Sequence, residues 1–122
     1  ALNENKKCLK GSKILLLGLS YKKDIDDLRE SPSLKLIELL QDEGAIVDYS
    51  DDYVTVIPKL RKYEFKKKSV KINKKNISKY DLVLLSTDHS YYDYKLIFDN
   101  AKIIVDSRNA FKKFKGKKLY KA

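Results

Sequence analysis

The chain has 122 residues, a formal net charge of +10 and a hydrophobic content of 43%. This length suits one domain with a single core, and this apolar share is typical of a soluble globular protein rather than a disordered one. The longest apolar runs, such as residues 14–17, are far too short to cross a bilayer, and no apolar signal segment opens the sequence. We therefore expect a cytoplasmic protein with no membrane partner.

The positive charge suggests anionic partners, because a basic surface attracts phosphates and nucleic acids. Only three of the 27 basic residues are arginines, however, and the lysines are spread along the chain. Lysine suits solvated surface, whereas recognition of bases and phosphates favours arginine. We expect no nucleic-acid partner, and a basic nucleic-acid-binding α/β module stays the alternative function.

The chain contains one cysteine and one histidine, Cys8 and His89. A single cysteine cannot form an internal disulfide, which fits a reducing compartment. No partner base accompanies Cys8, so we interpret it as an incidental residue near a flexible terminus. One cysteine and one histidine cannot supply the ligands of a structural zinc site, so we expect no metal.

The first half of the chain predicts a strand, a helix and a second strand. After a polar start at residues 1–12, residues 13–18 form an apolar run that glycine ends, which is typical of a strand buried on both faces. Ser31 and Pro32 suit the cap and first position of a helix, and Gly44 suits its end. Residues 45–49 form the next strand, so the unit is βαβ and its strands are parallel.

The second half predicts further strands that alternate with helices. Residues 81–86 and 102–106 form buried strands. We expect a short helix at 77–80, and a second one at 91–100 with Ser90 and Asp93 in capping-box spacing. The less regular middle contains possible edge strands, at 54–57 and 69–72, and the chain ends in a lysine-rich tail at 112–121. This alternation predicts an α/β fold: a Rossmann-like, doubly wound, mostly parallel sheet with helices on both faces.

Polar loops follow three of these strands, at residues 18–31, 86–90 and 106–111. Open α/β sheets bind ligands beyond the carboxyl ends of their strands. In the first loop Tyr21 and Lys22 could meet a base and a phosphate, and the helix that begins after it adds amide donors. Gly18 is the only glycine there, so the loop lacks the Gly-x-Gly-x-x-Gly fingerprint of a complete NAD site.

Other polar residues in these loops have alternative interpretations. Asp24, Asp26 and Asp27 could hold Mg²⁺ or accept a phosphoryl group as in a receiver domain, although the neighbouring lysines and arginine favour local ion pairs. His89 could act as a base or hydrogen-bond a ligand, and it could equally pack or cap the next helix. Arg108 could reach an anion across the crevice or pair with the preceding aspartate.

Three segments together resemble the C-terminal domain of the UDP-glucose/GDP-mannose dehydrogenase family. They are KILLLGLSYKKDIDDLRESP at 13–32, LVLLSTDHSYYDY at 82–94 and IVDSRNAF at 104–111. By this resemblance residues 1–12 end an upstream helix or linker, and residues 13–122 are a UDP-sugar-binding domain. Such enzymes oxidise the C6 hydroxymethyl of a nucleotide sugar to a carboxylate in two steps, with two NAD⁺ and a covalent cysteine intermediate. The products serve the synthesis of capsule and other polysaccharides.

The resemblance also implies roles for single residues. Tyr21 and Lys22 match the pair that contacts the UDP-sugar, Arg108 matches a late arginine that contacts the substrate, and Arg29 matches an arginine that reaches the NAD phosphates. The family's catalytic cysteine, lysine and aspartate lie upstream, so this chain has no catalytic residue and should be inactive alone. NAD would be bound mainly by the missing N-terminal domain. The expected partners are the UDP-sugar, the upstream domains of the same chain and, at full length, a second copy in a homodimer. The segments TDHS and DSRNA resemble the sequences of the branch that acts on UDP-N-acetylhexosamines.

Overall fold

The computed structural model describes residues 10–20, 32–57, 67–111, 114, 116 and 118–121. Its centre is a five-stranded sheet in the order β2-β1-β3-β4-β5, and every neighbouring pair of strands is parallel. The prediction of an α/β, Rossmann-like fold is therefore confirmed. The strands are β1 (Lys13–Leu17), β2 (Ile46–Ser50), β3 (Leu82–Leu85), β4 (Ile104–Asp106) and β5 (Leu119–Lys121).

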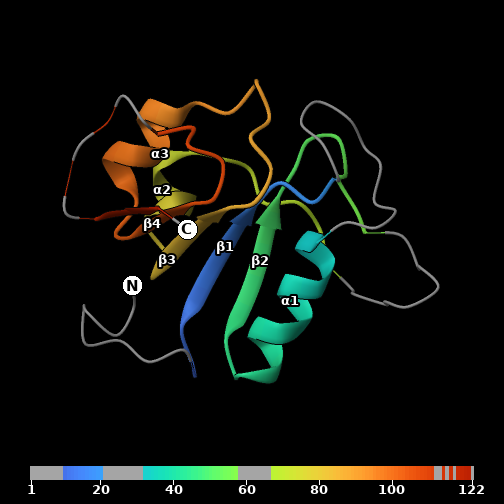
Figure 1. The fold of residues 1–122 in the computed structure, drawn as a ribbon. Coiled ribbons are helices and arrows are strands. Elements are labelled where there is room, and N and C mark those ends of the chain that lie inside the picture. Colours follow the sequence, from blue (N-terminus) through green and yellow to red (C-terminus); the bar gives the residue numbers. More distant parts are fainter. Residues whose placement is uncertain are drawn as a thin grey trace.

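Helices cover both faces of this sheet (Figure 1). Helix α1 (Pro32–Asp42) lies on one side, beside β1 and β2, and the short helices α2 (Lys74–Ile77) and α3 (Tyr94–Asn100) lie on the other. The side chains of β1 alternate between the two layers, as a strand buried on both faces requires. Full burial of one such aliphatic side chain contributes about 1.5–3 kcal/mol. Ile14 and Leu16 pack with Leu34 and Ile37 of α1, whereas Leu15 and Leu17 pack with Ile77 of α2 and Ile97 of α3.

Gly44 ends α1, as the sequence predicts. Its φ is +90°, a left-handed conformation that favours glycine, and an added Cβ would approach the Lys10 side chain to 2.9 Å. The predicted cap Ser31 lies outside the described residues, and Pro32 is the first residue of the helix. The start and the end of α1 therefore lie where Pro32 and Gly44 predict them.

The structure corrects the prediction of strands at 54–57 and 69–72. In these segments only two isolated bridges form, between Val56 and Lys68 and between Tyr49 and Ser69. The chain turns immediately after β2 because the amide of Val54 donates to the carbonyl of Asp51 at 3.1 Å. The Tyr49 hydroxyl then donates to the Val54 carbonyl at 2.7 Å, so this segment cannot continue as a straight strand.

The beginnings of the two short helices also differ from the prediction. Helix α2 starts earlier than residue 77, because the Asn73 side chain caps it and accepts from the amide of Asn76 at 2.8 Å. Helix α3 starts at Tyr94 rather than 91, because Asp93 is itself the cap and accepts from the amide of Leu96 at 3.1 Å. The predicted capping box is therefore wrong: Asp93 fills the cap position, not the third position of the helix. Strand β5, at the end of the lysine-rich tail, was not predicted.

None of the helices in the described ranges has both the length and the apolar character that crossing a bilayer requires.

Candidate functional site

Four of the five parallel strands send a described loop away from the same edge of the sheet, which we call the carboxyl edge. The described parts of these loops are residues 18–20 after β1, 51–57 after β2, 86–93 after β3 and 107–111 after β4. Ligands of open α/β sheets bind at such an edge. The buried polar side chains of the described residues are concentrated in or beside these loops, namely Ser20, Ser33, Ser50, Asp51, Thr87, His89 and Asp106.

Gly18 brings the first and third loops into direct contact. Its φ is +90°, and an added Cβ would lie 2.4 Å from the Cβ of Thr87, a distance that no side chain tolerates. The Thr87 hydroxyl donates to the carbonyl of Ser20 at 2.8 Å, which fixes the same contact from the other side. This glycine is therefore explained by the close approach of two backbones.

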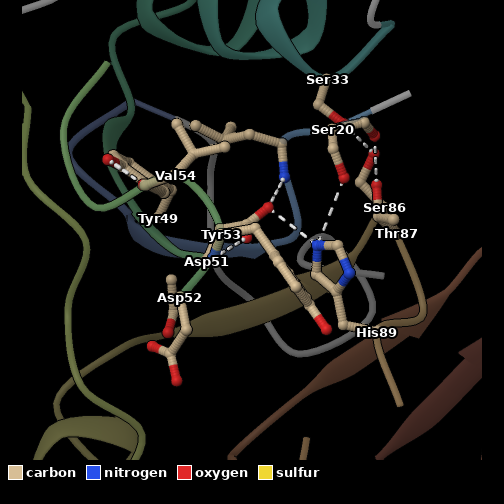
Figure 2. Close-up of polar contacts among 12 residues, drawn as sticks. Ser20, Ser33, Tyr49, Asp51, Asp52, Tyr53, Val54, Ser86, Thr87 and His89 are labelled. Carbon is tan, nitrogen blue, oxygen red and sulfur yellow. Dashed lines mark hydrogen bonds and ion pairs between the residues drawn. The ribbon is translucent and has the colours of Figure 1, made fainter. Parts of the chain in front are cut away.

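Asp51 joins three of the loops through one buried carboxylate. One of its oxygens, Oδ2, accepts from the amide of Leu19 at 2.8 Å and contacts His89 Nε2 at 2.8 Å, while Oδ1 accepts from the amide of Tyr53 at 2.9 Å. Figure 2 shows these contacts converging on the carboxylate. Burial would raise the pKa of Asp51, but the hydrogen bonds from His89 and the two amides hold it below its ordinary value. The side chain is therefore a carboxylate at neutral pH.

Ser20, His89 and Asp51 are the residue types of a Ser-His-Asp triad, but their geometry differs from one. The Ser20 hydroxyl lies 3.3 Å from His89 Nε2, and the Asp51 carboxylate lies 2.8 Å from that same nitrogen (Figure 2). A proton relay needs the serine and the aspartate on opposite nitrogens of the imidazole. The side chains of His89 and Asp51 are also fully buried. Their contact with Ser20 is therefore structural and does not activate the serine as a nucleophile.

His89 is also the centre of an aromatic cluster, defined here as Tyr53, His89, Tyr91 and Tyr92. The imidazole centroid lies 4.8, 5.6 and 5.5 Å from the rings of Tyr53, Tyr91 and Tyr92 respectively, and the ring of Tyr91 is stacked on it with an interplanar angle of 19°. Tyr92 is buried and donates to the Ser50 carbonyl at 2.5 Å, whereas Tyr53 and Tyr91 are exposed by 42% and 38%. The carboxyl edge therefore presents two tyrosine rings on a buried support.

Arg108 stands on a turn that Asp106 builds. The buried Asp106 carboxylate accepts from the backbone amides of Arg108 at 2.9 Å and Phe111 at 2.8 Å, and Asn109 between them has a φ of +59°. The exposed Arg108 side chain donates through Nε to the carbonyl of Ser86 at 2.9 Å. The alternative of an Arg108–Asp106 side-chain ion pair is not what the structure shows: Asp106 binds the arginine through its backbone, so the guanidinium is held over the β3 loop.

The start of α1 meets the same part of the edge. Ser33, in its first turn, places its hydroxyl 2.5 Å from the hydroxyl of Ser86, whose carbonyl accepts from Arg108. A helix start carries a partial positive charge and suits an anion. The start of α1, Ser86 in the loop after β3 and Arg108 in the loop after β4 therefore lie together at the carboxyl edge.

The structure shows where only part of the predicted site lies, and the predicted ligand contacts stay predictions. Arg108 lies at the carboxyl edge, where its Nε donates to the Ser86 carbonyl, and His89 is a buried packing residue rather than an exposed base. Three further site residues, Tyr21, Lys22 and Arg29, lie outside the described residues, as do Cys8 and the acidic cluster Asp24, Asp26 and Asp27.

Two neighbouring residues of the edge were not predicted from the sequence: Asp51, which joins the loops, and Asp52 beside it. Their signal was present, because the two aspartates come one residue after the strand predicted at 45–49, and the rule that selected the other loops applies to this one as well. Within the described part of the chain, no group of three or more histidine, cysteine, aspartate or glutamate side chains could hold a metal ion.

Comparison with known proteins gives consistent matches. Residues 15–113 match the model of the UDP binding domain of the UDP-glucose/GDP-mannose dehydrogenase family. A putative UDP-glucose 6-dehydrogenase of Bacillus subtilis, YtcA, is 30% identical over 110 residues, which are 86% of this chain and 25% of that protein. A UDP-N-acetyl-D-mannosamine dehydrogenase of Campylobacter jejuni is 41% identical over 76 residues, covering 62% of this chain and 16% of that protein.

The fold has solved counterparts as well. The crystal structure of NDP-N-acetyl-D-galactosaminuronic acid dehydrogenase from Methanosarcina mazei Go1 matches with a TM-score of 0.74 and 27% identity, over 99% of this chain and 26% of that one. The chain therefore spans about a quarter of the length of YtcA and of this structure, and less of the Campylobacter protein.

Proposed function

The chain belongs to the UDP-glucose/GDP-mannose dehydrogenase family, as its UDP-binding domain, and from this premise we propose that it binds the nucleotide sugar for a longer NAD-dependent UDP-sugar 6-dehydrogenase. The observation that carries the proposal is the family match over residues 15–113, which includes all four described loops of the carboxyl edge. No observation favours nucleic-acid binding, since the family model and the similar proteins are those of UDP-sugar dehydrogenases.

The whole enzyme would convert the C6 hydroxymethyl group of a UDP-sugar to a carboxylate. We assign the reacting groups to domains outside this chain, because the chain spans only about a quarter of a relative such as YtcA. NAD would supply the hydride acceptor and would also be held mainly outside it. The single glycine of the β1 loop supports this division, because Gly18 serves the contact with Thr87 rather than an approach to a pyrophosphate.

Within this chain we assign substrate binding to Tyr21, Lys22 and Arg108, and contact with the NAD phosphates to Arg29. The geometry of Arg108 supports its assignment: Asp106 holds its backbone, Ser86 holds Nε, and the exposed side chain can still present its terminal nitrogens to a diphosphate. A guanidinium oriented in this way binds an anion with little further loss of side-chain freedom.

For the sugar we propose a UDP-N-acetylhexosamine in preference to UDP-glucose. The support is the sequences TDHS and DSRNA in the loops after β3 and β4. A second support is the similarity to the UDP-N-acetyl-D-mannosamine dehydrogenase of Campylobacter jejuni over 76 residues. We further propose that the full-length enzyme works in the cytoplasm as a homodimer.

Titration calorimetry with UDP tests the binding role directly. We expect the 122-residue chain to bind UDP weakly, and Arg108→Ala to weaken binding by about tenfold, because a charged hydrogen bond to a phosphate contributes about 1.5 kcal/mol or more. Lys95→Ala is the matched control: it removes a cation that pairs with Asp99 on the exposed side of α3. Equal losses in the two variants, or no UDP binding by a folded chain, would contradict the proposal.

A further inference from the structure

Thr87, in the loop after β3, contacts the segment where the chain leaves β1. Its hydroxyl donates to the carbonyl of Ser20 at 2.8 Å, and its backbone amide donates to the carbonyl of Leu17 at 3.1 Å. Between these two contacts lies Gly18, at which an added Cβ would clash with Thr87. One buried residue therefore holds the end of β1 through both its side chain and its backbone.

Two other side chains hold the same segment. The Asp51 carboxylate accepts from the amide of Leu19 at 2.8 Å, and His89 Nε2 lies 3.3 Å from the hydroxyl of Ser20. Figure 2 shows the contacts of Ser20 with Thr87 and His89. All of these residues are buried, so a polar group that loses its partner here incurs the full cost of desolvation. The backbone up to Ser20 therefore has a defined position relative to the loops after β2 and β3.

Ser20 directly precedes two residues to which we assign the UDP-sugar, Tyr21 and Lys22. It is also the last described residue before them. The place from which a binding side chain starts is set by the backbone before it, and contacts that fix this backbone reduce the freedom that is lost when a ligand binds. The contacts of Leu19 and Ser20 can therefore raise the affinity for a ligand that binds further along the loop.

We propose that Thr87 is a positioning residue for substrate binding, which fixes the point from which the chain continues to Tyr21 and Lys22. The Thr87 hydroxyl is buried and already bonded to Ser20, so it acts through the β1 loop and not by contact with the ligand. The inference rests on the proposed function, to which it adds a residue outside the binding set.

Arg108 is positioned by different contacts, and this separation makes the proposal testable. Its amide donates to the Asp106 carboxylate, and its Nε donates to the carbonyl of Ser86. Loss of the Thr87 hydroxyl should therefore weaken binding through Lys22 and leave the contribution of Arg108 intact. A residue that only stabilised the fold would weaken every contribution alike.

The test is an NMR titration of the ¹⁵N-labelled 122-residue chain with UDP, in which the amide shifts give the dissociation constant. Thr87→Val keeps the shape of the side chain and removes its hydroxyl, and we expect it to weaken binding roughly fivefold, which corresponds to one lost hydrogen bond. Thr87→Ser keeps the hydroxyl and should bind almost as well as the wild type. Thr55→Val is the matched control, because it removes the hydroxyl of an exposed threonine in the loop after β2.

A double-mutant cycle separates positioning from stability. In the Lys22→Ala background the loss caused by Thr87→Val should almost disappear, whereas in the Arg108→Ala background it should stay roughly fivefold. Thr87→Ala removes the same hydroxyl without placing a methyl group against the Ser20 carbonyl, and it repeats the cycle with a second variant. Dispersed spectra show that each variant is folded.

The outcomes separate this inference from the proposed function. Equal losses from Thr87→Val in all three backgrounds, or equal losses for Thr87→Val and Thr87→Ser, would overturn the inference and leave the proposed function standing. Lys22→Ala that binds UDP as the wild type does would also overturn it, because Thr87 would then have no binding group to position. A folded wild-type chain that shows no shift with UDP would contradict both.

Discussion

Asp51 and Asp106 occupy similar places, each at the carboxyl end of a parallel strand and each almost fully buried, yet their carboxylates make different kinds of contact. Asp51 follows β2 and bonds to Leu19 and His89, which are 32 and 38 residues away in the sequence. Asp106 is the last residue of β4, and its carboxylate accepts from amides two and five residues ahead of it. The first carboxylate joins separate loops, and the second shapes a single turn.

The difference has an energetic consequence. A carboxylate that only accepts from amides of its own turn can be lost with local damage, because the strands around it keep their contacts. Removing Asp51 instead takes a carboxylate acceptor from the buried His89 and the buried amide of Leu19, and from the amide of Tyr53, in three different loops. Buried polar groups that lose a partner incur the full cost of desolvation. Replacement of Asp51 should therefore destabilise the protein more than replacement of Asp106. The two replacements should also affect different neighbours, the aromatic cluster for Asp51 and Arg108 for Asp106.

The largest expected effect is that of Asp51→Ala on stability. We expect the free energy of unfolding to fall by about 3 kcal/mol or more, because the buried His89 and the buried amide of Leu19 lose the charged acceptor that compensates their desolvation. Urea denaturation followed by circular dichroism measures the change. Asp52→Ala removes the adjacent, exposed carboxylate and should cost less than about 0.5 kcal/mol. Similar losses at the two positions would show that the Asp51 contacts do not stabilise the fold.

A smaller and more local effect is expected for Asp106→Ala. Two amides lose their acceptor, and we expect the free energy of unfolding to fall by roughly 1–3 kcal/mol. Because the amide of Arg108 is one of them, UDP affinity should fall as well, while the amide shifts of Tyr91 stay close to those of the wild type. NMR and calorimetry on the same variant measure both. A perturbed aromatic cluster would mean that the two carboxylates are coupled after all.

The smallest effect concerns pH. Burial would raise the pKa of Asp51, but its hydrogen bonds lower it below the ordinary value of 3.8, so the unfolded chain takes up this proton first as the pH falls. The stability that the carboxylate contributes is therefore present above about pH 4 and is lost as the pH falls through the lower folded pKa. We expect Asp51→Asn to flatten the acid side of the stability curve, measured as melting temperature between pH 7 and 2. An unchanged acid slope would argue against a lowered pKa.

Much of the fold could be predicted from the sequence, because its signals are local. Uninterrupted apolar runs predict β1 and β3, since parallel strands are covered on both faces. Gly44 marks the end of α1 through its positive φ. The position of Arg108 beyond a buried strand followed from the same reasoning. In each of these cases a single residue, or a short run, determines the structure on its own.

The remaining features depend on which segments meet. The contacts of Asp51 require β2 and β3 to flank β1, a strand order that no local pattern specifies. Strand β5 lies in a lysine-rich tail, whose residues have no apolar pattern that would predict a strand. It forms because it pairs with β4. The aromatic cluster likewise joins Tyr53 to Tyr91 and Tyr92 across two loops, and in the sequence these residues are unremarkable.

The buried contact between Asp51 and His89 also limits how this domain can change over evolutionary time. Loss of the histidine alone would leave the buried Asp51 carboxylate without its contact to the imidazole, and loss of the aspartate alone would leave the buried imidazole with the Ser20 hydroxyl but no carboxylate. A protein in which only one of the two residues has been replaced should therefore be less stable than one with both residues or neither. Among related domains, these two positions should therefore change together, as an Asp–His pair or as a neutral pair of similar volume.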